Sequence, residues 1–264
     1  MLDILFFGSV IFYLISITLN FLALAAKKES FHRLVWMVFL AGFTFHLAFF
    51  VSRGIVAGRL PLANQFEFAM SFALGISFTY IVLRLKFRIT WITTIALISV
   101  GLIMIYTSLQ PRAIRDLMPA LRSPWFTLHI IPAAFSYAAF LLAGCTGLKY
   151  LLALKKGEQE DSAQMRQMDY FSYRLIAVGI LLLTVVILSG AVWAEQAWSS
   201  FWSWDPKELW SLITWIIYAI YLHQRLRKNW QGKRMAIFAI AGVVIVLFTF
   251  VGVNTLLPGL HSYR

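Results

Sequence analysis

Eight apolar stretches run along this chain, and each can provide the roughly 20 residues that a membrane-spanning helix requires. They cover residues 4–25, 34–51, 66–83, 89–109, 126–154, 171–192, 207–224 and 236–257. The chain is 61% hydrophobic and 13% charged, whereas soluble proteins are about 45–50% apolar and 25% charged. Because unpaired backbone groups in lipid are costly, helices are the only plausible spans. We predict an all-α integral membrane protein with about eight transmembrane helices in a single domain over residues 1–264.

The basic residues predict how these helices are oriented. When alternate loops are grouped, one set holds sixteen Lys and Arg residues and the other holds seven. The positive-inside rule assigns the richer set to the cytoplasmic side or its organellar equivalent, so both termini are expected outside. The first stretch lacks a basic n-region and a small-residue cleavage site, which favours a retained span over a removable signal peptide.

Charge and cysteine content exclude several classes of function. The net charge is +12, but the basic residues are scattered over short inner loops where membrane orientation explains them, so we predict no nucleic-acid binding. Cys145 is the single cysteine. Without a second thiol the chain is not a dithiol reductase, and without a CxxCH motif it is not itself a c-type cytochrome.

The segment WAEQAWSSFWSWDPKELW, residues 193–210, holds five of the ten tryptophans. An aromatic belt at the membrane surface explains one or two tryptophans at a helix end, but not five in eighteen positions. Aromatic faces and indole N–H groups suit the binding of a flat apolar ligand. The candidates for that role are Trp193, Trp198, Trp202 and Trp204.

Asp205 ends this tryptophan-rich segment and is followed by Pro206, Lys207 and Glu208. This order matches an N-cap, a proline at the first helical position and an acidic residue that closes a capping box. We therefore interpret Asp205 first as the start of the seventh helix, and only second as part of a ligand site.

Four histidines lie where a membrane protein needs a reason to place them. His46 and His223 fall inside helices, while His129 and His261 lie at the outer ends of the fifth and eighth helices. An ionisable residue within the membrane is a functional hypothesis by default, although an isolated histidine is often only hydrogen-bonded to a neighbouring helix. His32 lies in a basic inner loop and is expected to be solvated.

Pairs of imidazoles from different helices commonly hold a haem iron from both faces, and imidazole also suits zinc or copper. Zinc and copper sites usually add carboxylate or thiolate ligands at close spacing. Here the histidines are far apart and surrounded by aromatic residues, which favours haem. Outer arginines can pair with its propionates; the candidates are Arg53, Arg59, Arg112, Arg115 and Arg122.

These blocks resemble the CcsA (ResC) family of System II cytochrome c biogenesis proteins, which carry a tryptophan-rich WWD signature. The signature is matched by residues 193–223. Three further blocks match in the same order: GRLPLANQFEF (58–68), SPWFTLHIIPAAFSYAAF (123–140) and FVGVNTLLPGLHSYR (250–264). The resemblance covers essentially the whole chain.

The resemblance implies an external WWD surface on which His129 and His261 ligate haem b. It also implies a second, deeper haem site that involves His46 and His223, although their depths in the membrane are expected to differ by about 10 Å or more, so they need not share one haem. The implied partners are a separate CcsB-like (ResB) membrane protein, an apocytochrome c with a CxxCH motif and, indirectly, a thiol-reducing thioredoxin-like protein. The implied location is a bacterial cytoplasmic membrane or a plastid thylakoid membrane, with the WWD segment on the periplasmic or lumenal side.

We therefore predict haem delivery for cytochrome c maturation, with this chain as the haem-binding subunit of a cytochrome c synthase (haem lyase) complex. Two alternatives stay open. A haem-b electron-transfer subunit would hold its ligands inside the bundle and need no external tryptophan loop, and a haem transporter would release free cargo and favour inverted repeats or broken helices.

Overall fold

The computed structural model describes residues 1–27, 29–257 and 259. The described residues form helices joined by turns and loops and contain no β-strand. The helices are α1 (Leu2–Ala26), α2 (Glu29–Ala57), α3 (Gln65–Lys86), α4 (Thr93–Ser108), the 3₁₀ turn η1 (Pro119–Leu121), α5 (Pro124–Lys155), α6 (Ala163–Trp198), α7 (Pro206–Arg227), α8 (Lys233–Leu247), the π-helical turn η2 (Phe248–Gly252) and α9 (Val253–Leu256).

A helix covers all or most of each of the eight predicted apolar stretches, so the all-α prediction is confirmed. Six helices, α1, α2, α3, α5, α6 and the α8–α9 segment, are long and apolar enough to cross a membrane. The apolar helix α4 has only 16 residues, and α7 mixes tryptophan and tyrosine with polar residues. The chain is an integral membrane protein; the number of eight spans and the side of the termini stay predictions.

The largest difference from the sequence prediction is the length of α6. It was expected over residues 171–192, but it runs over Ala163–Trp198. Ser162 caps its start by accepting a hydrogen bond from Met165 N at 3.3 Å, so the connection between α5 and α6 is only residues 156–162. At the other end Trp193 and Trp198 belong to the helix, and Ser199 ends it in the left-handed region at φ 56°.

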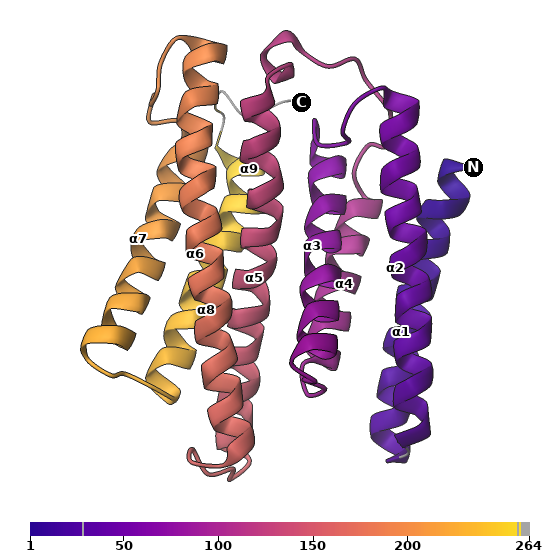
Figure 1. The fold of residues 1–264 in the computed structure, drawn as a ribbon, viewed down its shortest axis with the longest axis vertical. Helices are drawn as coiled ribbons and strands as arrows, with labels where there is room; N and C mark the ends of the chain where they lie inside the picture. Colours follow the sequence, from indigo (N-terminus) through magenta and orange to yellow (C-terminus); the bar gives the residue numbers. More distant parts are fainter. Residues whose placement is uncertain (28, 258, 260–264) are drawn as a thin grey trace. The chain divides into compact units, whose positions relative to one another are not determined.

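The chain packs as two compact units, the first over residues 1–117 and the second from Met118 onward. In the first unit α1 packs on α2 and α4, and α3 packs on α4 (Figure 1). In the second unit α5 packs on both α6 and α8, and α7 packs on α6 and α8. The single domain expected over the whole chain stays a prediction.

A buried charge cluster fixes two loops of the first unit, the one between α2 and α3 and the one after α4. Glu67, in the first turn of α3, is fully buried. Its Oε1 accepts from Arg53 Nε at 3.0 Å, and its Oε2 accepts from Arg59 Nη1 at 2.8 Å. Arg53 Nη1 also donates to the Arg112 carbonyl at 2.9 Å, which ties the loop after α4 to α2. Arg53 and Arg59 were expected to pair with haem propionates; the structure gives both guanidinium groups a partner within the chain.

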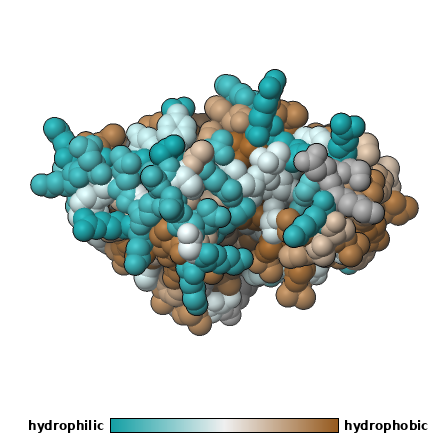
Figure 2. Space-filling view, turned by 90° about the horizontal axis from the view of Figure 1, so that it is seen from below, coloured by the Kyte–Doolittle hydropathy of each residue, from teal (hydrophilic) through white to brown (hydrophobic). Residues whose placement is uncertain are grey.

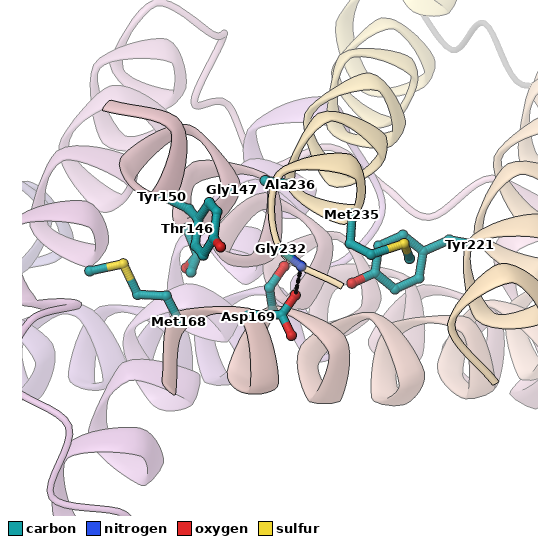
Figure 3. Close-up of a pocket in the computed structure, with 10 residues that line it drawn as sticks. Thr146, Gly147, Tyr150, Met168, Asp169, Tyr221, Gly232, Met235 and Ala236 are labelled. Carbon is teal, nitrogen blue, oxygen red and sulfur yellow. Dashed lines mark hydrogen bonds between the residues drawn. The ribbon is translucent and has the colours of Figure 1, made fainter. Parts of the chain in front are cut away.

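A second polar cluster closes one end of the second unit (Figure 3). The Asp169 carboxylate on α6 accepts from Gly232 N at 3.0 Å and forms an ion pair with Arg225 at 2.6 Å. Gly232 has φ 65°, and a Cβ there would lie 2.8 Å from the Tyr150 hydroxyl. Only glycine therefore fits this turn between α7 and α8 without displacing its neighbours.

The cluster lies at the end of the unit that carries the α5–α6 and α7–α8 connections (Figure 1). Seen from below, hydrophilic side chains gather over the helix ends and hydrophobic ones lie at the rim (Figure 2). This is the end to which the basic connector residues belong, among them Lys155, Lys156 and Lys228. A hydrophilic end and a hydrophobic rim suit a helix bundle that ends at a membrane surface.

Candidate functional site

His129 lies on α5, one turn inside the helix that Ser123 caps by accepting a hydrogen bond from Trp125 N at 3.2 Å. Its imidazole is half-buried. The ring nitrogen Nδ1 lies 2.8 Å from the Val186 carbonyl oxygen on α6. A carbonyl only accepts hydrogen bonds, so Nδ1 carries a proton, and in the neutral imidazole the lone pair is then on Nε2. This is the arrangement in which metal-ligating histidines are usually held.

Gly190 on α6 allows the imidazole of His129 to approach that helix. A Cβ at residue 190 would lie 2.6 Å from Nδ1 and 2.8 Å from Cε1 of the ring. Real Cβ atoms do not come so close to other heavy atoms, so any larger residue would push the ring away from the Val186 carbonyl. The absence of a side chain at residue 190 is therefore part of how His129 is oriented.

The ring of Trp193 packs against the imidazole of His129. Its side chain is 1% exposed, and its indole ring packs against Phe126, His129 and Trp198 at centroid distances of 5.3, 5.7 and 4.9 Å. The indole Nε1–H donates to the Ala120 carbonyl at 2.8 Å, which anchors η1 to α6. Trp193 was expected to offer a face to a ligand; in the structure its ring is buried and packs against these three side chains.

Trp202 and Trp204 lie in the loop between α6 and α7 and contact each other edge to face at 5.8 Å. Trp204 is 67% exposed and has φ 60°. A bulky residue in the left-handed region costs about 1–2 kcal/mol, and an exposed indole gains nothing from burial. Of the four candidate tryptophans, Trp204 is exposed, Trp198 and Trp202 are half-buried, and Trp193 is buried, so Trp204 is the one that the fold leaves most accessible to a ligand.

Asp205 begins α7 as predicted. Its side chain accepts from Lys207 N at 2.9 Å. A capping box is also present: the Asp205 side chain accepts from the backbone N of Glu208, and the Asp205 backbone N donates to the Glu208 carboxylate at 3.2 Å. Gly259 lies against the Asp205 carboxylate. Gly259, two residues before His261 in the sequence, therefore lies beside the start of α7. His261 itself lies outside the described residues.

His46 is fully buried on α2. Its Nδ1 lies 3.2 Å from the Tyr13 hydroxyl of α1, and that hydroxyl lies 3.1 Å from Ser77 Oγ of α3. Its Nε2 makes no hydrogen bond within the described part of the chain, although the Met70 main chain lies beside the ring. A buried polar nitrogen without a partner needs an explanation, and a role as a ligand is one.

His223 differs from His46 in its surroundings. It lies on α7, as predicted, but its side chain is exposed. His32, expected to be solvated, is exposed as well, although it lies in the first turns of α2 and not in a loop. His46 and His223 belong to different units. The expectation that they need not share one haem stays a prediction.

Comparison with known proteins identifies the class. The family model described as "Cytochrome C assembly protein" matches residues 2–261. A CcsA protein of Prochlorococcus marinus is 36% identical over 295 residues, which cover 98% of this chain and 93% of the relative. A CcsA protein of Chlamydomonas reinhardtii is 37% identical over 217 residues, which cover 78% of this chain and 62% of the relative. The chain therefore belongs to the cytochrome c assembly protein family, in its CcsA branch.

The fold has a solved counterpart. The structure of a cytochrome c haem lyase, CcmF, aligns with a TM-score of 0.71 over 95% of this chain and 46% of its own length. The two sequences are 15% identical over the alignment. This likeness shows that the helices are arranged in a known way, and it says nothing by itself about ligands.

Proposed function

We propose that this chain binds haem as cargo and presents it on the outer face of the membrane for covalent attachment to a CxxCH apocytochrome c. His129 and His261 would hold the iron, and Trp198, Trp202 and Trp204 would lie against the porphyrin. The bonds form between haem and the substrate thiols. The contribution of this chain is binding, orientation and exchangeable ligation. We propose a CcsB-like membrane protein as its partner in this step.

The observation that supports the proposal most directly is the tautomer of His129. The Val186 carbonyl holds the proton on Nδ1, so the histidine is oriented as a neutral imidazole whose Nε2 can bind iron. It lies near the start of α5, and that start is at the same end of the second unit as the loop between α6 and α7 (Figure 1). Family membership supports the role in cytochrome c biogenesis.

A second function is favoured by one observation. His46 is fully buried and its Nε2 has no hydrogen-bond partner in the described residues, as expected for a haem ligand inside a helix bundle. A haem at this position is also what an electron-transfer subunit would hold. The exposed Trp204 in the loop between α6 and α7 has no use in such a subunit, so we retain haem delivery as the main function.

Reconstitution tests the proposed function. A membrane system that lacks this chain is supplied with a CxxCH apocytochrome, haem, a reductant and the partner membrane protein, and covalent haem is measured by haem staining of denatured gels. Covalent attachment is expected only when the chain is added. Attachment at the same rate without the chain, or a purified chain with no haem absorbance, would contradict the proposal.

Replacing Trp204 with glycine separates ligand binding from folding. Glycine adopts φ 60° without strain, so the fold is expected to gain about 1 kcal/mol while the outer site loses a stacking face. Haem retention by the purified chain is therefore expected to fall although its thermal stability does not. Trp210, which packs on Phe248 at 4.4 Å, provides the matched control: Trp210→Gly should lower stability. Unchanged haem retention in Trp204→Gly would rule out this role for Trp204.

A further inference from the structure

Arg84 is held between three helices at one end of the first unit. It lies in the last turn of α3 and is half-buried. Its guanidinium carbon lies 4.8 Å from the centroid of the Trp36 ring on α2, and its Nη1 donates to Thr93 Oγ1, at the start of α4, at 3.3 Å. The guanidinium is therefore fixed in position and does not extend freely into solvent.

The partners of this guanidinium are neutral. The Thr93 hydroxyl also accepts from the Tyr80 hydroxyl at 2.9 Å and donates to the Thr90 carbonyl at 2.7 Å, so it brings no negative charge. Among the side chains that the structure describes, no carboxylate pairs with Arg84. Guanidinium N–H groups point outward in the plane of the group, so stacking on Trp36 leaves the remaining ones able to donate. A half-buried cation with neutral partners and spare donors favours an anionic ligand.

The surroundings of the guanidinium suit a ligand with both an anionic group and apolar chains. The last residues of α1 and α3 and the first residues of α2 and α4 lie at this end of the unit (Figure 1). Exposed basic residues gather there: Lys27, Arg33, Lys86 and Arg88. Two apolar residues that directly follow the indole and the guanidinium in the sequence, Met37 and Leu85, are 58% and 64% exposed. Basic residues attract anionic headgroups, and exposed apolar side chains can contact acyl chains.

We propose that Arg84 and Trp36 form a binding site for the phosphate group of an anionic phospholipid in the leaflet at this end. The edge of the guanidinium donates to the phosphate oxygens, a geometry that suits arginine better than lysine, while Trp36 covers its face. The acyl chains lie along the exposed apolar residues of α2 and α3. A free phosphate ion offers the same oxygens but makes no contact with those residues, so the surroundings favour the lipid. The site is separate from the proposed haem site and does not depend on it.

A purely structural role for Arg84 predicts a different result. A cation in the last turn of a helix stabilises the helix dipole, and Lys86, in the same turn, is equally placed to do so. Lys86 is exposed and has the same charge, so Lys86→Gln is the matched control for Arg84→Gln. If only the charge of the helix end matters, the two variants bind lipid alike.

The experiment uses the full-length chain, purified in detergent and stripped of lipid. Dioleoyl phosphatidylglycerol, dioleoyl phosphatidylcholine or inorganic phosphate is titrated in, and native mass spectrometry measures the fraction of the chain that carries each. We expect Arg84→Gln to weaken the binding of phosphatidylglycerol about tenfold, through the loss of charge-assisted hydrogen bonds. Lys86→Gln should weaken it less than about threefold. Arg84→Lys keeps the charge but not the planar N–H edge, so its affinity should lie between those of the original chain and Arg84→Gln, and it serves as the test where the glutamine variant does not fold.

The outcomes decide the assignment. Tighter binding of phosphatidylglycerol than of phosphatidylcholine, weakened in Arg84→Gln and kept in Lys86→Gln, supports the site. Equal losses in the two variants overturn it, because the lipid then responds only to the overall charge of this end. Equal binding of the two lipids contradicts an anionic ligand. Inorganic phosphate that binds as tightly as phosphatidylglycerol also overturns the proposal, because the site then recognises a free ion.

Discussion

Replacing Glu67 with alanine is expected to have the largest effect on stability of any single change in the first unit, with a loss of about 3–5 kcal/mol. The carboxylate is fully buried, and Arg53, the more buried of its two arginine partners, is 3% exposed. Removing it leaves two guanidinium groups, those of Arg53 and Arg59, without their counter-charge. A buried charge without a partner costs far more than the ion pair contributes.

The same change removes the anchor of two loops, the one before α3 and the one after α4. Glu67 Oε2 accepts from Ala63 N at 2.7 Å, which closes the turn before α3, and Arg53 reaches from Glu67 to the Arg112 carbonyl. Without the carboxylate both connections lose their anchor. We therefore expect the Glu67→Ala chain to show protease cleavage in residues 58–64 and 109–117 before the helices unfold.

Circular dichroism during thermal unfolding in detergent measures the loss of stability. Limited proteolysis measures the cleavage of the two loops. Asp3→Ala is the control, because it removes the carboxylate of the exposed Asp3–Arg112 pair, which is 80% and 40% exposed. Such a pair contributes at most about 1 kcal/mol after screening by solvent. Equal stability losses in Glu67→Ala and Asp3→Ala would show that the buried cluster does not hold the loops.

The helices could be predicted from the sequence because each depends on local chemistry. Long apolar stretches need satisfied backbone groups, which fixes the helical state. Asp205, Pro206 and Glu208 fix the start of α7 through neighbours within one turn, and the capping box is present as predicted. The end of α6 could not be predicted, because hydrophobic periodicity stops before Trp193 whereas packing of Trp193 on Phe126 extends the helix.

The supporting residues of the site could not be predicted, because they depend on contacts between distant parts of the chain. His129 was a candidate from its position, but its acceptor, the Val186 carbonyl, is 57 residues away. Tyr13 and Ser77 are separated by 64 residues. A polar residue within an apolar stretch was a usable signal for Tyr13 and Ser77. The Val186 carbonyl and the missing side chain at Gly190 give no comparable signal in the sequence.

Replacing Gly190 with alanine is expected to weaken haem binding at the outer site about 10- to 100-fold, close to the loss caused by His129→Ala itself. The new Cβ would lie 2.6 Å from Nδ1 of His129, so the ring must retreat by most of an ångström. The 2.8 Å bond to the Val186 carbonyl is then broken, and the proton is no longer held on Nδ1. Haem titration of the purified chain, followed by absorption, measures the loss.

Gly179→Ala is the matched control for the cost of overpacking. It lies on the same helix, and its Cβ would come equally close, 2.6 Å, to Cε1 of Phe140. Both substitutions should lower stability by about 1–3 kcal/mol, but only Gly190→Ala changes the orientation of an imidazole. Haem affinity should therefore fall in Gly190→Ala and stay within about twofold of the original in Gly179→Ala, because no hydrogen bond to a ligand histidine is lost there. If both variants lose haem in proportion to their stability, the affinity reflects the general packing of α6, and Gly190 has no specific role at His129.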